Sequence, residues 1–200
     1  MTFEPALPLV ELIDASLQLR AWQPGDAADL LEAAQSSVTS VGPWLPWCHA
    51  GYDIADANSW ISHCQSGWSC SEHFAFAIFD RATDELIGGA GLSQRNRRDR
   101  SANLGYWVRQ SRQGQGIAAR AARLVAGFGF EQLALIRIEI VVRPENHPSR
   151  RTAEKVGARF EAIARQRMWA VGRPHDAAVY GLIASDLLQP AAAHSRAISS

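Results

Sequence analysis

The sequence predicts an α/β fold built on a mixed, mostly antiparallel sheet of seven strands, with its elements in the order β-α-α-β-β-β-α-β-α-β-β. Three observations support this. The length of 200 residues suits one domain. The chain is 47% apolar and 20% charged, which is typical of a globular protein with a core. Strand patterns occur first as hairpins and then on both sides of a helix.

The first third of the chain predicts a strand, a helix, a loop and a second helix. Residues 17–22 alternate in polarity as a strand does, and Pro24 is placed to open a helix with acidic residues in its first turn. Residues 36–52 contain two prolines and large aromatics and are expected to form a loop. A helix is expected over about 54–68. The residues expected near one face of it are Ile54, Trp60, Ile61 and Cys64.

Three strands are expected next, over 72–80, 85–94 and 102–109. The turn RATDE joins the first two, and the charged segment 95–101 joins the second to the third. The adjacent glycines of the middle strand indicate a bulge or a close approach of backbone.

The second half begins with the longest expected helix, about 115–133. Its apolar residues at helical spacing are Ile117, Ala121, Leu124, Val125 and Phe128. A strand follows over 136–142, then a helix that runs through about Val156 and ends at Gly157. Residues 158–171 and 176–185 predict a final antiparallel pair. The domain is expected to span 1–186, and the segment 187–200 is expected to be a flexible tail.

Composition excludes several classes of protein. It does not fit a disordered, collagen-like or disulfide-scaffold chain. No run approaches the ~18 apolar residues of a membrane span, and the N-terminus lacks the basic residues of a secretory signal. The three cysteines, Cys48, Cys64 and Cys70, predict free thiols in a reducing cytoplasm. His63 and His73 lie near two of them, but the spacings match no zinc pattern, so no metal is expected.

Charge is distributed unevenly although the formal net charge is zero. Residues 1–90 hold twelve acids and two bases, whereas residues 91–200 hold eighteen bases and eight acids. The basic half suits a polyanionic ligand, or the two halves simply attract each other. Since no nucleic-acid-binding motif accompanies the charge, nucleic acid is not expected as a direct partner, and no membrane partner is expected.

The segment VRQSRQGQGIAAR (108–120) predicts a strand, a glycine-rich turn and the start of the long helix. Backbone N–H groups of such a turn have no intrahelical acceptor and form an anion site together with the helix dipole. Gly114 and Gly116 permit close approach of phosphate oxygens. The arginines around this turn are Arg109, Arg112, Arg120 and Arg123. The P-loop pattern is absent, and GQGIAA has Ala where a dinucleotide fingerprint has its third Gly.

QGQGIA (113–118) resembles the acyl-CoA motif of the GNAT acetyltransferase superfamily, and NHPSRRTAEKVGARFEAIARQR resembles the second half of that site. GPWLPW and GRPHDAAVYGLIASD are similar to the RimJ/RimL branch, whose members acetylate protein N-termini. The resemblance covers about residues 15–186. It implies the GNAT fold, with helices on both faces of the sheet, and acetyl-CoA as co-substrate.

The resemblance implies that strands 102–109 and 136–142 splay apart, and that pantetheine pairs with backbone between them. An N–H near Val108 would polarise the thioester carbonyl. The residues implied to bind the cofactor are Trp107, Val108, Arg109, Gln113, Gly114, Gln115, Gly116, Ile117, Ala118 and Asn146.

The resemblance also suggests catalytic residues. Ser149 matches a proton donor to the leaving thiolate, although Asn146 or Ser149 would equally suit a helix N-cap. Glu161 matches an acidic position that deprotonates the amine through water, and Glu139 is an alternative base. Lesser candidates are His175, Asp176 and Tyr180.

The acceptor is expected to be a primary amine attacked in a ternary complex, with no covalent intermediate on Cys48. An α-amine has a pKa near 8, so roughly a tenth is neutral at pH 7, against about one in 2,500 for a lysine amine. This favours a protein N-terminus. Residues 41–52 and the second helix are expected on the acceptor side. Trp44, Trp47 and Tyr52 would form its wall, or they would equally suit sealing the edge of the core.

Two alternatives remain open from the sequence. One is acetylation of a small amine such as an antibiotic, a polyamine or an amino-sugar. The other is a CoA-binding sensor without catalysis. The resemblance also admits a homodimer.

Overall fold

The strands form one sheet in the order β1-β2-β3-β4-β5-β6-β8-β7. The computed structural model describes residues 8–188. The strands are β1 (Leu12–Ile13), β2 (Leu17–Ala21), β3 (Phe74–Asp80), β4 (Leu86–Asn96), β5 (Ser101–Val108), β6 (Arg137–Val142), β7 (Arg159–Ala170) and β8 (Arg173–Leu182). Only β5 and β6 pair in parallel. The mixed, mostly antiparallel sheet is thus confirmed, with an eighth strand, β1, whose two residues are too few to produce a polarity pattern.

The helices are α1 (Ala27–Gln35), α2 (Val38–Val41), α3 (Ile54–Ser69), α4 (Ile117–Glu131), α5 (His147–Val156) and α6 (Ala184–Leu187), with short 3-10 turns η1 (Pro24–Asp26) and η2 (Gln110–Arg112). The expectation of a continuous loop over 36–52 was wrong, because α2 forms there and buries Val41. A single turn of helix is too short for its apolar period to stand out in a sequence.

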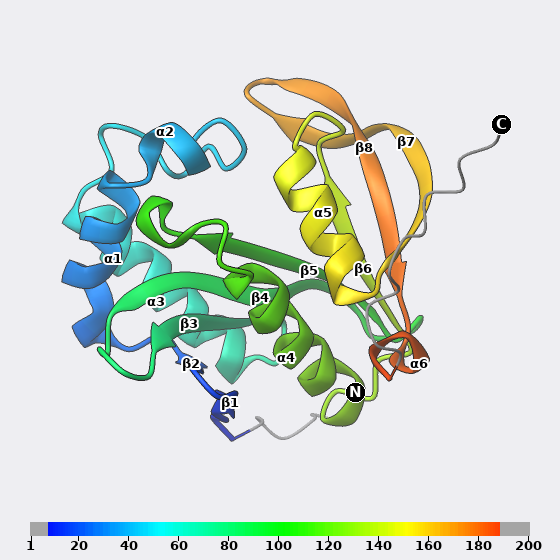
Figure 1. Ribbon diagram of the computed structural model, residues 1–200, viewed down its shortest axis with the longest axis horizontal. Helices are drawn as coiled ribbons and strands as arrows, with labels where there is room; N and C mark the ends of the chain where they lie inside the picture. The colour runs from blue at the N-terminus through cyan, green and yellow to red at the C-terminus, as the bar shows by residue number, and fades with distance from the viewer. Residues whose placement is uncertain (1–7, 189–200) are drawn as a thin grey trace, which may run out of the picture.

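Helices cover both faces of the sheet, as Figure 1 shows for α4 in front and α3 behind. The larger buried cluster contains Phe74, Phe76 and Ile78 of β3 together with the apolar side of α4. The smaller cluster joins α1 and α3 to the other face, with Ala75 and Ala77 of β3. Successive β3 residues therefore serve different cores, which follows from the two-residue period of a strand.

The buried side of α3 differs from the expected one. Ile61 and Cys64 are buried as expected, but Ile54 and Trp60 are 46% and 41% exposed. The buried residues of this helix are Ala57, Ile61, Cys64, Gly67 and Trp68. Small residues at two of these positions carried no hydrophobic signal in the sequence.

The glycines of β4 allow a close approach of backbone, as their adjacency suggested. A Cβ at Gly88 would overlap the carbonyl oxygen of Trp107, and one at Gly91 would lie 2.6 Å from the carbonyl oxygen of Phe74. Because no side chain fits at Gly91, the sheet surface stays bare at that position.

Strands β6, β8 and β7 carry α5 and form the second part of the molecule in Figure 1, beyond the edge of β5. Of the expected tail, Leu187 still ends α6, and its carbonyl accepts a hydrogen bond of 2.5 Å from Arg123. The rest of the tail, after Leu188, lies outside the described residues. Between residues 8 and 188, no helix combines the length and the apolar content that a bilayer crossing requires.

Candidate active site

Strands β5 and β6 separate after three paired residues. Ser101, Ala102 and Asn103 pair with Arg137, Ile138 and Glu139, and the strands diverge beyond them. A cavity of about 490 Å³ lies in the gap, which we call the wedge cavity. It is lined by residues 104–108 of β5, residues 140–142 of β6, one side of α5 and the loop that leads into α4. We call this loop, residues 113–118, the α4 entry loop. One edge of β5 pairs with β4 while the other edge faces this cavity.

The loop before α4 has the geometry of an anion cradle. Gly114 and Gly116 have φ angles of 78° and 75°, and no atom lies within 4 Å of a Cβ built at either. Gly116 is the N-cap of α4. Among the described residues, the N–H groups of residues 114–118 have no acceptor. These amides are therefore unused hydrogen-bond donors beside the cavity, and the positive end of the α4 dipole lies there too.

Most residues expected to bind the cofactor line the wedge cavity. They are Trp107, Val108, Gln113, Gly114, Gly116, Ile117, Ala118 and Asn146. The Gln113 side chain also donates to the Val108 carbonyl at 2.9 Å, which ties the loop to β5. The structure does not bring Gln115 or Arg109 to this lining.

The arginines around the loop are held by acidic residues or carbonyls of the fold. Arg109 contacts Glu32 at 2.6 Å and Glu85 at 3.0 Å, and Arg112 contacts Glu85 at 2.6 Å. Arg120 contacts Asp14, and Arg123 donates to two carbonyls. The contacts of Arg109, Arg112 and Arg120 join the basic half to the acidic half, as the alternative of mutual attraction predicted. Part of the charge asymmetry is thus balanced within the fold.

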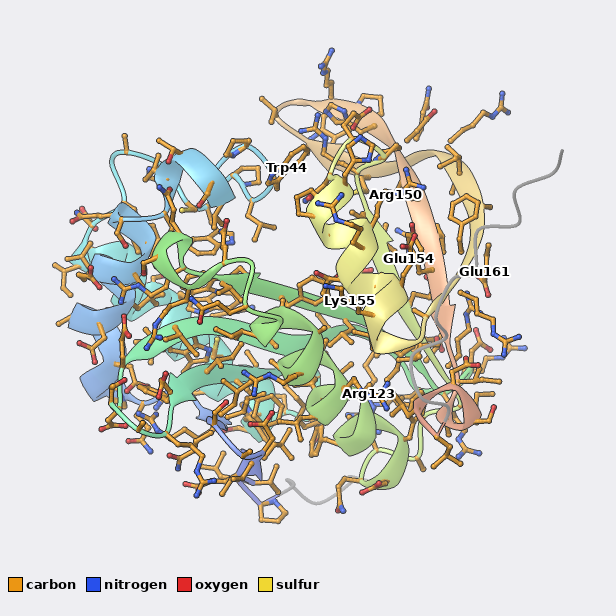
Figure 2. All side chains as sticks on the ribbon, viewed as in Figure 1. Trp44, Arg123, Arg150, Glu154, Lys155 and Glu161 are labelled. Atoms are coloured by element: carbon orange, nitrogen blue, oxygen red, sulfur yellow. The ribbon has the colours of Figure 1, made fainter. Side chains whose placement is uncertain are left out.

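Two cations remain available beside the loop. Arg151 and Lys155 are exposed, lie one turn apart on α5 and line the wedge cavity. Within the described part of the chain, neither has an acidic partner. Lys155 is labelled on α5 in Figure 2. Sequence reasoning missed both, because only the fold places α5 against the cavity.

A pair of hydroxyl groups lies where α5 meets β5. Ser149 Oγ donates to the Tyr106 hydroxyl at 3.3 Å, and the Tyr106 hydroxyl donates to the Ser149 carbonyl at 3.0 Å. Burial raises the pKa of Tyr106 to about 12, so this hydroxyl stays protonated at neutral pH. Asn146 is the N-cap of α5 and accepts from the Ser149 N–H at 3.2 Å.

The two carboxylates expected to act as base lie away from both cavities. Glu161, on β7, forms two hydrogen bonds with Arg137, of 2.5 and 2.8 Å. Figure 2 places it on the β7 side of the molecule, far from Trp44. Its hydrogen bonds to Arg137 hold its pKa below the usual value. Glu139 contacts the same Arg137 at 3.1 Å. A carboxylate bound to arginine outside the cavities is poorly placed to take a proton there.

The lesser candidates also have structural partners. His175 contacts the Ala170 carbonyl, and Asp176 accepts from the Gln166 N–H. Tyr180 is fully buried and bonds to Arg150 and Glu154. None of the three lines either cavity.

A second cavity, of about 560 Å³, lies on the α3 side of the sheet; we call it the sheet-face cavity. Its floor contains the register row Ala75, Gly91 and Gly105, which crosses β3, β4 and β5 with no side chain beyond a methyl group. Trp47 and Tyr52, the residues predicted to wall the acceptor side, line this cavity. Trp44 instead lines the wedge cavity, where Arg143 stacks over its ring at 5.4 Å.

The two cavities meet at β5. Leu45, Gly105, Tyr106 and Trp107 line both of them. A molecule in the wedge and one on the sheet face can therefore touch at this point. Sequence reasoning missed Gly91, Gly105 and Tyr106. The glycine-rich sequence of β4 was an available signal, but only the register of the folded sheet shows that Gly91 lies beside Gly105 of β5.

The cysteines are free thiols in the structure, with Cys48 and Cys64 buried and Cys70 exposed. Burial raises the pKa of Cys48, and its Sγ lies 3.4 Å from the Ala34 carbonyl oxygen. This environment is typical of an inert structural thiol. Within residues 8–188, no three His, Cys, Asp or Glu side chains are grouped to hold a metal ion.

Comparison with known proteins identifies relatives of the whole fold. The family model described as an acetyltransferase (GNAT) domain matches residues 16–159. The probable N-acetyltransferase YjcK of Bacillus subtilis (strain 168) is 34% identical over 136 residues, 68% of this chain and 75% of the relative. The putative ribosomal N-acetyltransferase YdaF of the same strain is 26% identical over 86% of this chain and 93% of its own.

Among solved structures, RimJ of Mycobacterium smegmatis in complex with CoA-disulfide superposes with a TM-score of 0.80. It is 27% identical, and the match covers 92% of this chain and 90% of that chain.

Proposed function

Because the chain belongs to the GNAT acetyltransferase family, we propose that it transfers acetyl from acetyl-CoA to a protein N-terminal α-amine by direct attack in a ternary complex. The observation that carries this proposal is the meeting of the two cavities at Gly105, Tyr106 and Trp107. A thioester bound in the wedge and an amine on the sheet face would touch there, so no covalent enzyme intermediate is needed.

The wedge cavity fits a coenzyme with a pyrophosphate. The free N–H groups of residues 114–118 suit phosphate oxygens, and the two glycines leave room for them. Arg151 and Lys155 supply positive charge on the facing helix. The free edge of β5 suits a pantetheine arm that hydrogen-bonds like an added strand. The CoA-disulfide bound to the RimJ relative supports this choice of ligand.

Tyr106 and Ser149 suit the leaving group. When the C–S bond breaks, the electron pair goes to sulfur and the thiolate requires a proton. The paired hydroxyls of Ser149 and Tyr106 line the wedge cavity and remain protonated at neutral pH. Ser149 is therefore the proposed donor. The proton that the amine nitrogen loses as the amide forms restores the Ser149 hydroxyl, and the Tyr106 hydroxyl orients that group by accepting its hydrogen bond.

An α-amine suits the sheet-face cavity. Trp47, Tyr52 and Trp107 form aromatic walls, with ring centroids of Trp47 and Trp107 5.2 Å apart. Asp56 lines the same cavity and favours a cationic acceptor. The name of YdaF supports a ribosomal protein as the source of the N-terminus. A small amine is the second candidate, because a cavity of about 560 Å³ has the size of small-molecule sites.

The test compares acceptors by mass spectrometry. The protein is incubated with acetyl-CoA and either N-terminal peptides of ribosomal proteins or a panel of polyamines, amino-sugars and aminoglycosides. We expect a gain of one acetyl group on the α-amine of at least one peptide. Acetylation of small amines only would support the second candidate. Binding of CoA without turnover on any amine would favour a sensor and overturn the proposal.

A further inference from the structure

The helix α3 presents one row of side chains to the sheet-face cavity. Their spacing of three or four residues places them on one side of the helix; they are Asp56, Ser59, Trp60 and His63. Trp60 is 41% exposed, although tryptophan is highly buried on average. Exposed aromatic surface at the rim of a pocket is typical of a ligand-binding site.

Tyr52 contributes an unused hydroxyl to the same cavity. The residue is only 5% exposed, yet its hydroxyl forms no hydrogen bond with residues 8–188. As part of the cavity lining, this hydroxyl is open to a ligand and is not sealed inside the fold. Buried tyrosine hydroxyls usually have a partner, so a ligand that brings a polar group would explain this one.

Burial raises the pKa of Tyr52 to about 12, and the charge of nearby Asp56 acts in the same direction. The hydroxyl therefore stays protonated at neutral pH, and its oxygen can accept a hydrogen bond from a cationic N–H group.

Asp56 gives this end of the cavity its charge. Of the side chains that the structure describes, it is the only carboxylate that lines the cavity, and no arginine or lysine lines it. Its Oδ2 accepts the Asp53 N–H at 3.0 Å, while Oδ1 accepts no hydrogen bond from the part of the chain that the structure covers. The side chain is half-buried, so solvent ions screen its charge less than that of an exposed group. A cation is therefore attracted here.

A row of aromatic rings joins this end to the place where the two cavities meet. Trp107 lines both cavities, and its ring centroid lies 5.2 Å from that of Trp47. The Trp47 ring in turn lies 5.8 Å from that of Tyr52. One indole thus separates the proposed position of the acceptor amine from Tyr52. The methylene stem of an arginine or lysine packs along such an apolar wall while its charged head stays at a polar group, and aromatic faces attract the cation.

We propose that Tyr52, Asp56 and Trp60 bind a second cationic group of the acceptor, an inference that rests on the acetyl transfer proposed above. The acceptor amine lies at Gly105, and a guanidinium or ammonium several bonds away is held by the Asp56 carboxylate and the Trp60 ring. For a protein N-terminus, this group is the side chain of an arginine or lysine as first residue. The site selects the acceptor by charge and takes no part in the bond changes.

The experiment compares two peptides that differ only in the charge of the first side chain. One begins with arginine and the other with citrulline, which has nearly the same shape and is neutral. The kcat and KM of α-amine acetylation are measured for each. We expect the wild type to favour the arginine peptide about tenfold in kcat/KM, which is the worth of one charged contact. The difference should lie in KM, because the contact is the same before and during the reaction.

Asp56→Asn should remove this preference by raising the KM of the arginine peptide about tenfold, with little change for the citrulline peptide. Asparagine keeps an oxygen that can accept the Asp53 N–H, so the start of α3 is preserved. Trp60→Leu, at the exposed rim, should reduce the preference by a smaller factor. The matched control is Asp29→Asn, which removes an exposed carboxylate of α1 outside both cavities and should keep the preference.

Equal rates of the wild type on both peptides, or turnover confined to peptides with a neutral first residue, would overturn the inference and leave the acetyl transfer intact. An equal loss on both peptides in Asp56→Asn would make Asp56 structural and would also overturn it. Spermidine is the third acceptor. If it reacts with a KM that rises in Asp56→Asn while neither peptide reacts, the second-cation site is supported and the protein N-terminus is overturned. Absence of turnover on every amine would overturn the proposed function, and this inference with it.

Discussion

The α4 entry loop and the sheet-face cavity are built in different ways. The loop, residues 113–118, uses consecutive backbone amides, and its geometry depends on the φ angles of Gly114 and Gly116. The sheet-face cavity uses side chains and bare positions from α3, β3, β4 and β5. One region is a local segment of chain, whereas the other exists only when four elements are assembled.

This difference explains why the loop could be predicted from the sequence and the cavity could not. A local anion cradle needs two glycines and a helix start, all within a few residues of one another. A cavity floor needs Ala75, Gly91 and Gly105 in one register row, although they are far apart in the chain. The following variants test whether the two regions are as separable in function as in construction.

The largest effect is expected from Gly105→Leu, at the junction of the two regions. No atom lies within 4 Å of a Cβ there, so the side chain should enter the cavities without disturbing the fold. Separating the reactants should lower kcat/KM by a factor on the order of 100, measured by thiol release from acetyl-CoA. Gly127→Leu is the control, since that α4 glycine is equally open and lines neither cavity. Equal rates in both variants would contradict the proposed meeting point.

Gly116→Val tests the loop alone. Valine is strained at a positive φ, and its branches would occupy the space proposed for phosphate. The Kd for acetyl-CoA should rise by a factor on the order of 30, which corresponds to about 2 kcal/mol of lost contacts. Calorimetry measures the affinity. Gly172→Val places the same residue at φ 69° in the open β7–β8 turn. If it weakens binding as much as Gly116→Val does, the effect is strain and not a phosphate site.

Ser149→Ala tests the donor to the thiolate. A thiolate is a good leaving group, with a thiol pKa near 8.5, so loss of the donor should lower kcat only by a factor on the order of ten. The acetyl-CoA affinity should change little. The control is Ser69→Ala, which removes an exposed hydroxyl bonded to the Gln65 carbonyl. An unchanged kcat in Ser149→Ala would exclude it as the proton donor.

Glu161→Gln should have the smallest effect on turnover, within about twofold, because its ion pair with Arg137 is on the surface and away from both cavities. Its pKa is lowered in the fold, so the stabilisation is present above the unfolded value of about 4.3 and is lost as pH falls through the folded pKa. Thermal melting from pH 3 to 7 should therefore show the variant less stable near pH 7 and equal to the wild type at the acid end. A large loss of kcat would restore Glu161 as the base.

Much of the fold could be read from the sequence because its signals are local. The alternation in 17–21 and the helical spacing after Gly116 each lie within one element. The errors arose where the pattern was too short or its partner distant. Strand β1 has two residues and α2 has four. Trp60 looked apolar enough for a core, yet only packing decided that it lies at the cavity rim.

The sequence by itself determined the order of elements, the position of the glycine turn and the start of α4, because backbone conformation depends on neighbouring residues. Only the tertiary structure decided which partners the charged side chains bind. It bound Arg109 and Arg112 to acidic side chains and held Glu161 at Arg137. It also brought the carboxylate of Asp56 to the same cavity as Gly105. Electrostatic partners and strand register join residues that are distant in the chain, so no local pattern specifies them.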